Sequence, residues 1–153
     1  MQILLVMCLT TGLCVVGMAY AAGDLGGSVK SALNTQKLIS VATQRTSGAW
    51  GRAAPVWFIY DGGAVYFITA PKSYKARRVL RGSPAQVWLN EKGKKTGLVF
   101  TGETHIVTDR TTLDRINNDY KRKYWTAWLT YWAMPLAARV DAGKMVVVRV
   151  APD

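Results

Sequence analysis

The chain has 153 residues and a formal charge of +11 at pH 7, because 20 Lys and Arg oppose 9 Asp and Glu. So strong a positive charge favours an anionic partner such as a phosphate-bearing cofactor, nucleic acid or an acidic membrane surface, and it does not choose among them. Both cysteines, Cys8 and Cys14, fall within the first 21 residues, so the rest of the chain excludes a disulfide, a thiolate metal site and a cysteine nucleophile.

Residues 1–21 form an uncharged, mostly apolar segment that ends in Ala19-Tyr20-Ala21. Small residues at this spacing are typical of a signal-peptidase site, so we expect a cleaved signal peptide and one domain over residues 22–153. The alternative is an uncleaved membrane anchor, since no Lys or Arg precedes the apolar run. Cleavage would make the mature protein an exported one, either periplasmic or secreted.

A β-hairpin is the clearest local signal in the chain. It follows a short helix predicted over residues 29–38 and a strand predicted over residues 38–44. Two apolar, β-branched and aromatic runs in APVWFIYDGGAVYFIT, residues 54–69, flank an Asp-Gly-Gly turn at 61–63. Because the runs do not alternate with polar residues, both hairpin faces need cover. One face can line a barrel, and the other needs a helix, a ligand or a second subunit.

A short basic helix should follow the hairpin, within FITAPKSYKARRVLRG, residues 67–82. Ser73 is the expected N-cap and Gly82 the expected stop. The expected apolar face consists of Ala76, Val79 and Leu80.

Cations gather where we expect this helix to begin, although the helix dipole disfavours positive charge there. They are Lys72, Lys75, Arg77 and Arg78. A bound phosphate would remove that cost, because exposed backbone N–H groups, the Ser73 hydroxyl and the cations would all face one dianion. A solvated basic helix face explains the run equally well.

The remaining elements complete a small β domain. Strands are predicted at residues 85–90, 97–108 and 144–150, with Gly102 marking a possible bulge in the second of these. Asp109 or Thr111 can cap a helix that continues to about residue 125. Six strands and two or three helices are best accommodated by a single β-barrel with attached helices.

Three stretches in this order make the sequence recognisable: APVWFIYDGGAVYFIT, SYKARRVLRGSPAQVWL and VVVRVAP. From about Leu33 to Pro152 the chain resembles the flavin-binding split-barrel family that includes pyridoxamine 5'-phosphate oxidase and related flavin- and deazaflavin-dependent proteins. The resemblance implies a mainly β fold, a six-stranded split barrel. It also implies a homodimer with two equivalent cofactor sites at the subunit interface.

The same resemblance implies which residues bind the cofactor. The second strand would lie along the isoalloxazine ring, which places Val56, Trp57 and Phe58 there. The end of the third strand and the following helix start would bind the phosphate, through Thr69, Ser73, Tyr74 and Lys75. We add Arg78 as a neighbouring cation. FMN is the first cofactor implied, a deazaflavin the second and haem the third.

Some positions depart from pyridoxamine 5'-phosphate oxidases. Those enzymes carry an arginine and a lysine on the second strand, where this chain has Pro55 and Tyr60, and a glutamine that Gly97 replaces here. We therefore do not expect oxidation of pyridoxamine phosphate itself.

Other chemistry-bearing residues favour ordinary structural roles. Glu103 lies two residues before His105, on the same strand face. One histidine and one carboxylate, with no cysteine in this part of the chain, are too few ligands for a metal ion, so no metal site is expected. An aromatic series at helical spacing predicts core or subunit contact, with an aromatic wall over the cofactor or a membrane-surface helix as alternatives. Its members are Tyr120, Tyr124, Trp125, Trp128 and Trp132.

The function predicted from sequence is thus an exported FMN-binding oxidoreductase acting on an unidentified small molecule. A flavoprotein of this kind needs no visible catalytic acid or base, because the ring performs the redox chemistry. The alternative is a binding protein without turnover that holds haem, a deazaflavin or another anionic ligand in the same barrel. No nucleic-acid partner is expected, since the chain has no recognition module, and no stable membrane partner beyond the leader.

Overall fold

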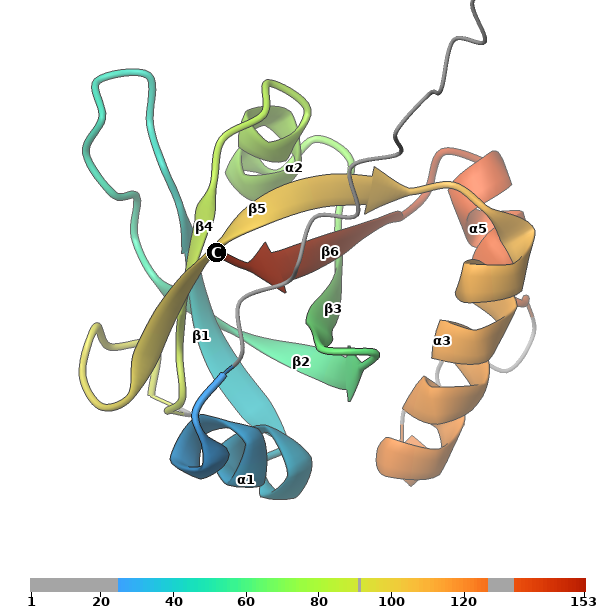
Figure 1. Cartoon of the computed structure of the whole chain (residues 1–153). Coiled ribbons are helices and arrows are strands. Elements are labelled where there is room, and N and C mark those ends of the chain that lie inside the picture. Colours follow the sequence, from blue (N-terminus) through green and yellow to red (C-terminus); the bar gives the residue numbers. More distant parts are fainter. Residues whose placement is uncertain (1–24, 91, 127–133) are drawn as a thin grey trace, which may run out of the picture.

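The computed structural model describes residues 25–90, 92–126 and 134–153. Six antiparallel strands close into a barrel in the order β1-β2-β3-β6-β5-β4, which confirms the six-stranded fold expected from the sequence (Figure 1). The proposed signal peptide, together with Trp128 and Trp132, lies outside the described residues. The elements are α1 (Gly27–Thr35), β1 (Leu38–Thr43), β2 (Ala54–Asp61), β3 (Ala64–Thr69), α2 (Tyr74–Val79), β4 (Ala85–Trp88), β5 (Val99–Val107), α3 (Arg110–Lys123), α5 (Leu136–Asp141) and β6 (Val146–Pro152).

The β2–β3 hairpin forms as its sequence predicts. Phe58 pairs with Phe67, and the register continues to the pair Asp61 and Ala64. Gly62 and Gly63 supply the turn with φ values of 55° and 76°, in the left-handed region that other residues rarely adopt.

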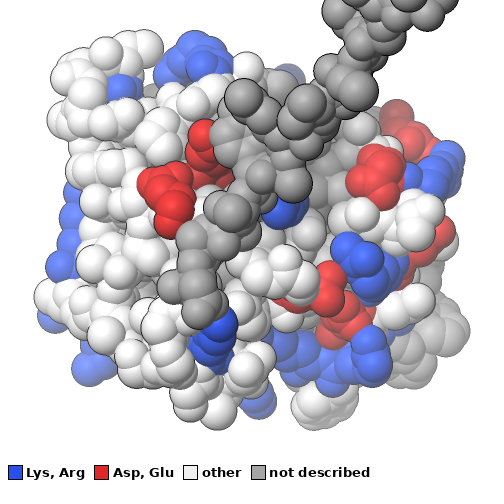
Figure 2. All heavy atoms as spheres, viewed as in Figure 1, with Lys and Arg blue, Asp and Glu red and all other residues white. Residues whose placement is uncertain are grey.

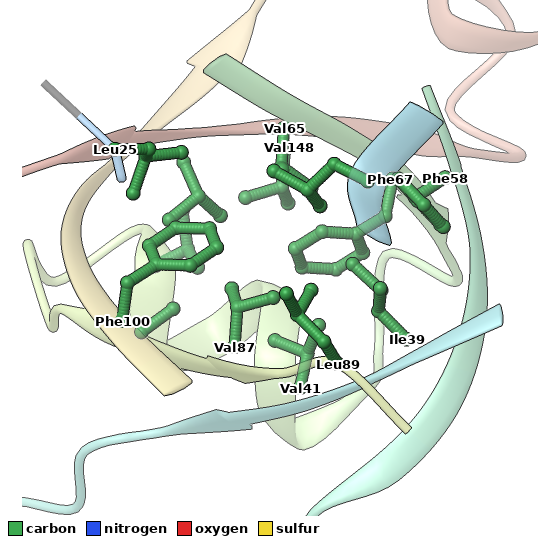
Figure 3. Packing of buried hydrophobic residues seen from close by; sticks show 14 residues of the cluster. Leu25, Ile39, Val41, Phe58, Val65, Phe67, Val87, Leu89, Phe100 and Val148 are labelled. Carbon is green, nitrogen blue, oxygen red and sulfur yellow. The ribbon is translucent and has the colours of Figure 1, made fainter. Parts of the chain in front are cut away.

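The barrel interior is a dry core of aromatic and aliphatic side chains from all six strands. Figure 3 shows the rings of Phe67 and Phe100 inside the barrel, among aliphatic side chains such as Val87 and Val148. Leu33 from α1 joins this core and has no exposed surface, because α1 lies across one end of the barrel (Figure 1). Among the described residues, the interior is therefore filled by side chains, as in other small barrels.

The outer face of the hairpin is covered by helices of the same chain. Ile59 and Tyr66 pack there against Leu113 and Ile116 of α3 and Leu136 of α5, forming a second core. Figure 1 shows α3 and α5 beside one another on that side of the barrel. One face of the hairpin is thus buried by the barrel core and the other by α3 and α5, so a single chain buries both faces here without a second subunit.

Gly102 does not form the bulge suggested by the sequence. Strand pairing is continuous through it, with Gly102 opposite Ala85 on β4 and opposite Pro152 on β6. A Cβ at this position would overlap the carbonyl oxygen of Ala151 and lie 2.9 Å from a methyl carbon of Val150. Glycine is needed here because the β6 backbone passes too close for any side chain.

Helix α2 is shorter than the basic stretch suggests, and this changes how its charges are placed. Ser73 is the N-cap as predicted, accepting a hydrogen bond from the Ala76 N–H at 3.1 Å. The helix has six residues, so Arg77 and Arg78 lie in its last turn, where the dipole favours cations. The unfavourable position is left to Lys75 within the helix. Leu80, predicted on the apolar face, is instead 67% exposed just beyond the helix end.

Asp109 caps α3, accepting the Thr112 N–H at 2.8 Å, and this bond lowers the pKa of its carboxyl below 3.8. We expect Asp109→Ala to lower the Tm at pH 7, because α3 then begins with an unpaired N–H. A carboxyl whose pKa is lowered by folding stabilises above its unfolded pKa and loses that contribution as the pH falls through the folded value. The Tm gap between wild type and variant should therefore shrink in thermal melts below about pH 3.8. Asp114→Ala, which removes an equal charge from α3 without removing the cap, is the control; an equal loss there would contradict the capping role.

Lys and Arg side chains are spread over several parts of the face seen in Figure 2 rather than gathered in one band. Within the described residues, no helix combines the length and hydropathy needed to cross a bilayer.

Candidate functional site

A cavity of about 440 Å³ lies against the start of β2 and the end of β3, beneath α3 and α5. We call it the β2–α3 cavity. Its walls are mostly apolar, with a few amide, hydroxyl and cationic groups among them. The lining residues are Pro55, Val56, Trp57, Ile68, Thr69, Ala70, Asn117, Tyr120, Lys121, Met134, Leu136, Arg139, Lys144 and Met145.

Three of the eight residues predicted to bind the cofactor line this cavity: Val56, Trp57 and Thr69. They come from two strands that the hairpin places side by side, which is why residues far apart in sequence meet at one wall. The other five occupy other positions, described in turn below.

The β2 wall is aromatic and held in place from α3. Trp57 is 39% exposed, and its ring stacks on Tyr124 with centroids 5.0 Å apart and an interplanar angle of 14°. Tyr120 stacks on Tyr124 in turn, and its hydroxyl donates to the Trp57 carbonyl at 2.9 Å. Trp57 is therefore a lining residue whose ring is held by stacking and which keeps exposed surface, and aromatic rings of this kind suit contact with a flat ligand.

The phosphate-binding residues predicted at the β3–α2 turn reach the cavity through Thr69. The Thr69 and Ser73 hydroxyl oxygens are 2.9 Å apart and share a hydrogen bond. Because Thr69 lines the cavity, Ser73 lies one hydrogen bond away from it. The turn thus presents two hydroxyl groups near the end of β3.

Lys75, in the first turn of α2, is half-buried. Burial, and secondarily the nearby charge of Arg78, lower the pKa of its amine below 10.5. Both causes disfavour the charged form, so an anion beside Lys75 would stabilise the ammonium group.

Tyr74 and Arg78 face other neighbours than the cavity lining. Tyr74 is 70% exposed and lies under the guanidinium groups of Arg77, at 4.7 Å, and Arg78, at 5.5 Å. Arg78 also donates to the carbonyl and hydroxyl oxygens of Thr43 at the end of β1, both at 3.4 Å. Arg78 therefore links α2 to the end of β1, and its guanidinium is already engaged there.

Phe58 points its ring into the barrel core and has no exposed surface. Only the backbone of Phe58 faces outward, and there it is contacted by the Tyr124 hydroxyl. This oxygen accepts the Phe58 N–H at 2.9 Å and lies 2.8 Å from the carbonyl oxygens of both Phe58 and Lys37. Burial raises the pKa of Tyr124 to about 12, so the phenol stays protonated and can donate to one of these carbonyls.

Sequence reasoning missed the cations of the cavity, Lys121, Arg139 and Lys144. They come from α3, from α5 and from the segment before β6, and Arg139 also contacts the Met145 sulfur at 3.7 Å. The basic stretch at α2 is contiguous in the sequence and so is visible there, whereas these three cations are dispersed along the chain. The only local signal was Tyr120, one residue before Lys121, in the aromatic series.

His105 pairs with Glu103 at 3.8 Å, and both side chains are more than half exposed on β5. Within the part of the chain that the structure describes, no group of three or more His, Cys, Asp or Glu side chains could hold a metal ion. Of the departures noted in the sequence, Pro55 lines the β2–α3 cavity and Tyr60 lies outside it.

A family model described as pyridoxamine 5'-phosphate oxidase matches residues 25–153. No curated protein matches the sequence.

Solved structures of low sequence identity share the fold. A candidate general stress protein 26 from Jannaschia sp. CCS1 is 23% identical, with a TM-score of 0.53 over 80% of this chain and 69% of that one. A candidate pyridoxamine 5'-phosphate oxidase from Listeria innocua is 15% identical, with a TM-score of 0.59 over 82% and 91%. HutZ, the haem storage protein of Vibrio cholerae, is 12% identical, with a TM-score of 0.61 over 85% and 91%.

Proposed function

Because the chain belongs to the pyridoxamine 5'-phosphate oxidase family, we propose that it binds a flavin, FMN first, in the β2–α3 cavity. The proposal depends mainly on one observation. Thr69 lines the cavity and is hydrogen-bonded to Ser73, in the turn that leads to the half-buried Lys75.

The size and lining of the cavity fit such a ligand. About 440 Å³ falls within the range of small-molecule and cofactor sites, which are mostly apolar with a few convergent polar groups. Val56 and Trp57 supply the apolar wall for the ring. Thr69, Ser73 and Lys75 supply two hydroxyl groups and a cation for the phosphate.

A bound flavin supplies hydride or single-electron transfer to a small molecule. The chain's own residues would orient the ring and exclude water from it. Tyr120 fixes the Trp57 carbonyl, and Met134 and Met145 are among the apolar residues that line the cavity. The cations that line the cavity favour electron-rich, anionic forms of whatever is bound there.

Haem is the second candidate, since a haem storage protein shares the fold. The chain has one histidine, and it lies on β5 outside the cavity lining. Histidine is the commonest axial ligand of haem, so this placement favours the flavin.

We further propose that the protein acts as a homodimer and is exported. A second copy could cover Trp57, which lines the cavity and is 39% exposed within one chain. Export rests on the apolar leader that ends in Ala19-Tyr20-Ala21.

The test of the ligand is the visible spectrum of the purified protein with and without added FMN. We expect flavin absorption bands that remain with the protein after gel filtration. A Soret band would favour haem, and a colourless protein that does not retain FMN would contradict both assignments.

The test of phosphate placement is Lys75→Ala, measured by the quenching of FMN fluorescence on binding. We expect roughly tenfold weaker binding, the low end of about 1.5–3 kcal/mol for a hydrogen bond to a charged group. Arg77→Ala is the matched control, because it removes the same charge from the same helix at an exposed position. Equal losses in the two variants would point to net charge and contradict a phosphate beside Lys75.

A further inference from the structure

The end of the barrel that carries α2 is rich in exposed cations. Residues 25–90 contain nine Lys and Arg but a single acidic residue, Asp61, which ends β2 and is paired with Arg115 at 3.0 Å. Several of the cations are exposed on α2, beside it or on the β1–β2 loop, and within residues 25–90, 92–126 and 134–153 these form no ion pair. They are Arg45, Arg52, Lys72, Arg77 and Arg81.

Two hydrogen bonds place the β1–β2 loop beside α2. The Gln44 N–H donates to the Pro84 carbonyl at 3.1 Å, which joins the start of the loop to the segment between α2 and β4. The Arg78 guanidinium on α2 donates to the Thr43 carbonyl at the end of β1. Figure 1 shows the loop and α2 at the same end of the barrel, opposite α1. Cations that are separated in the sequence therefore share one end of the molecule.

Two large side chains with apolar surface are exposed among these cations. Tyr74 begins α2 and Leu80 follows its last residue, and most of each side chain is accessible to solvent. The Arg77 guanidinium lies 4.7 Å from the centroid of the Tyr74 ring, so the ring is bordered by charge. We call this surface the α2 patch. It consists of Arg45, Arg52, Lys72, Tyr74, Arg77, Leu80 and Arg81.

The α2 patch does not depend on the residues proposed to hold the cofactor phosphate. Lys75 is half-buried in the turn assigned to that phosphate, and Thr69 and Ser73 are hydrogen-bonded to one another there. Arg78 is engaged with Thr43. The cations of the patch are instead exposed, so an anionic surface can reach them while the cavity is empty or filled.

We propose that the α2 patch docks the protein reversibly on an anionic phospholipid bilayer. The cations would face the lipid phosphates, each adding to an attraction that salt screens. Leu80 and the Tyr74 ring would enter the layer of headgroups, where leucine and aromatic side chains are favoured. A nucleic acid has the same negative charge but no apolar layer to receive Leu80, and this difference favours the bilayer.

Co-sedimentation of the full chain with lipid vesicles tests the proposal. One set of vesicles is phosphatidylcholine alone, and the other has equal parts of phosphatidylcholine and phosphatidylglycerol. The neutral vesicles measure any binding through the apolar leader, which does not require lipid charge. We expect at least about tenfold tighter binding to the anionic vesicles at low salt, with the difference shrinking as salt is added. Equal binding to both sets would overturn the proposal.

A paired charge removal locates the docking surface. Arg77→Gln combined with Arg81→Gln should weaken binding to the anionic vesicles about twentyfold, from about fivefold for each cation near the lipid. Lys37→Gln combined with Lys94→Gln is the control, because it removes the same charge from exposed lysines before β1 and in the β4–β5 turn, at the α1 end of the barrel (Figure 1). Equal losses in the two double variants would show that only net charge matters and would overturn the assignment to the α2 patch.

Leu80→Gln distinguishes a bilayer from other partners of the same surface. Leu80 is mostly exposed, so the fold should be retained, which circular dichroism can verify. We expect about fivefold weaker binding to the anionic vesicles and unchanged retention on heparin, a soluble polyanion. Unchanged vesicle binding would overturn the lipid assignment. A change in the oligomeric state of Leu80→Gln in gel filtration would instead show that a second copy covers the α2 patch, and it would overturn the proposal as well.

Discussion

Replacing Gly102 by valine should destabilise the barrel by about 3 kcal/mol, measured as the free energy of unfolding in urea. The added Cβ would overlap the Ala151 carbonyl oxygen and crowd the Val150 side chain, neither of which can move without shifting β6. Valine favours strands by at most about 1 kcal/mol, which does not compensate for this overlap. Gly102→Ala should show a smaller loss of the same sign.

The control for Gly102 is Gly27→Ala. Gly27 begins α1, and nothing lies within 4 Å of a Cβ placed there. Alanine is a better helix former than glycine by up to about 1 kcal/mol, so this variant should be unchanged or slightly more stable. A Gly102→Val variant as stable as wild type would contradict the close approach of the β6 backbone to Gly102.

Tyr124→Phe should cost about 2 kcal/mol of unfolding free energy. The phenol oxygen accepts the Phe58 N–H and contacts two backbone carbonyls, and the side chain is 4% exposed. Phenylalanine would keep the stacking on Trp57 but leave a buried N–H without a partner, which costs about 1–3 kcal/mol.

Tyr74→Phe is the matched control, because it removes the same group from a side chain that is 70% exposed. We expect its stability to stay within about 0.5 kcal/mol of wild type. Urea unfolding followed by tryptophan fluorescence measures both variants, and equal stabilities would contradict the bridging role of the Tyr124 hydroxyl.

The strands could be predicted from sequence because their signals are local. The Asp-Gly-Gly turn fixes the β2–β3 hairpin, and the apolar run of β6 needs no tertiary information. Gly102 was misjudged for the opposite reason. A bulge and a close backbone approach both call for glycine, and only the position of β6 distinguishes them.

The candidate site was predicted in part. Thr69 and Trp57 were expected at the site because the resemblance assigns the second strand and the end of the third strand to the cofactor, and both line the cavity. The cations Lys121, Arg139 and Lys144 could not, since they meet only through the packing of α3 and α5 against the barrel. The burial of Lys123 against Phe58 depends in the same way on where α3 ends, and a charged residue at a helix terminus gives no sequence signal for it.

The pairing of β1 with β4 completes the barrel, so each of the six strands has hydrogen-bonded neighbours on both sides. An open sheet exposes an edge to which another copy can add a strand, and edges of this kind are common starting points for aggregation. This barrel must first separate two of its own strands before strand addition can occur. Intact molecules therefore associate through side-chain contacts rather than by strand addition. The cationic and aromatic side chains on the surface then determine which partners the protein binds.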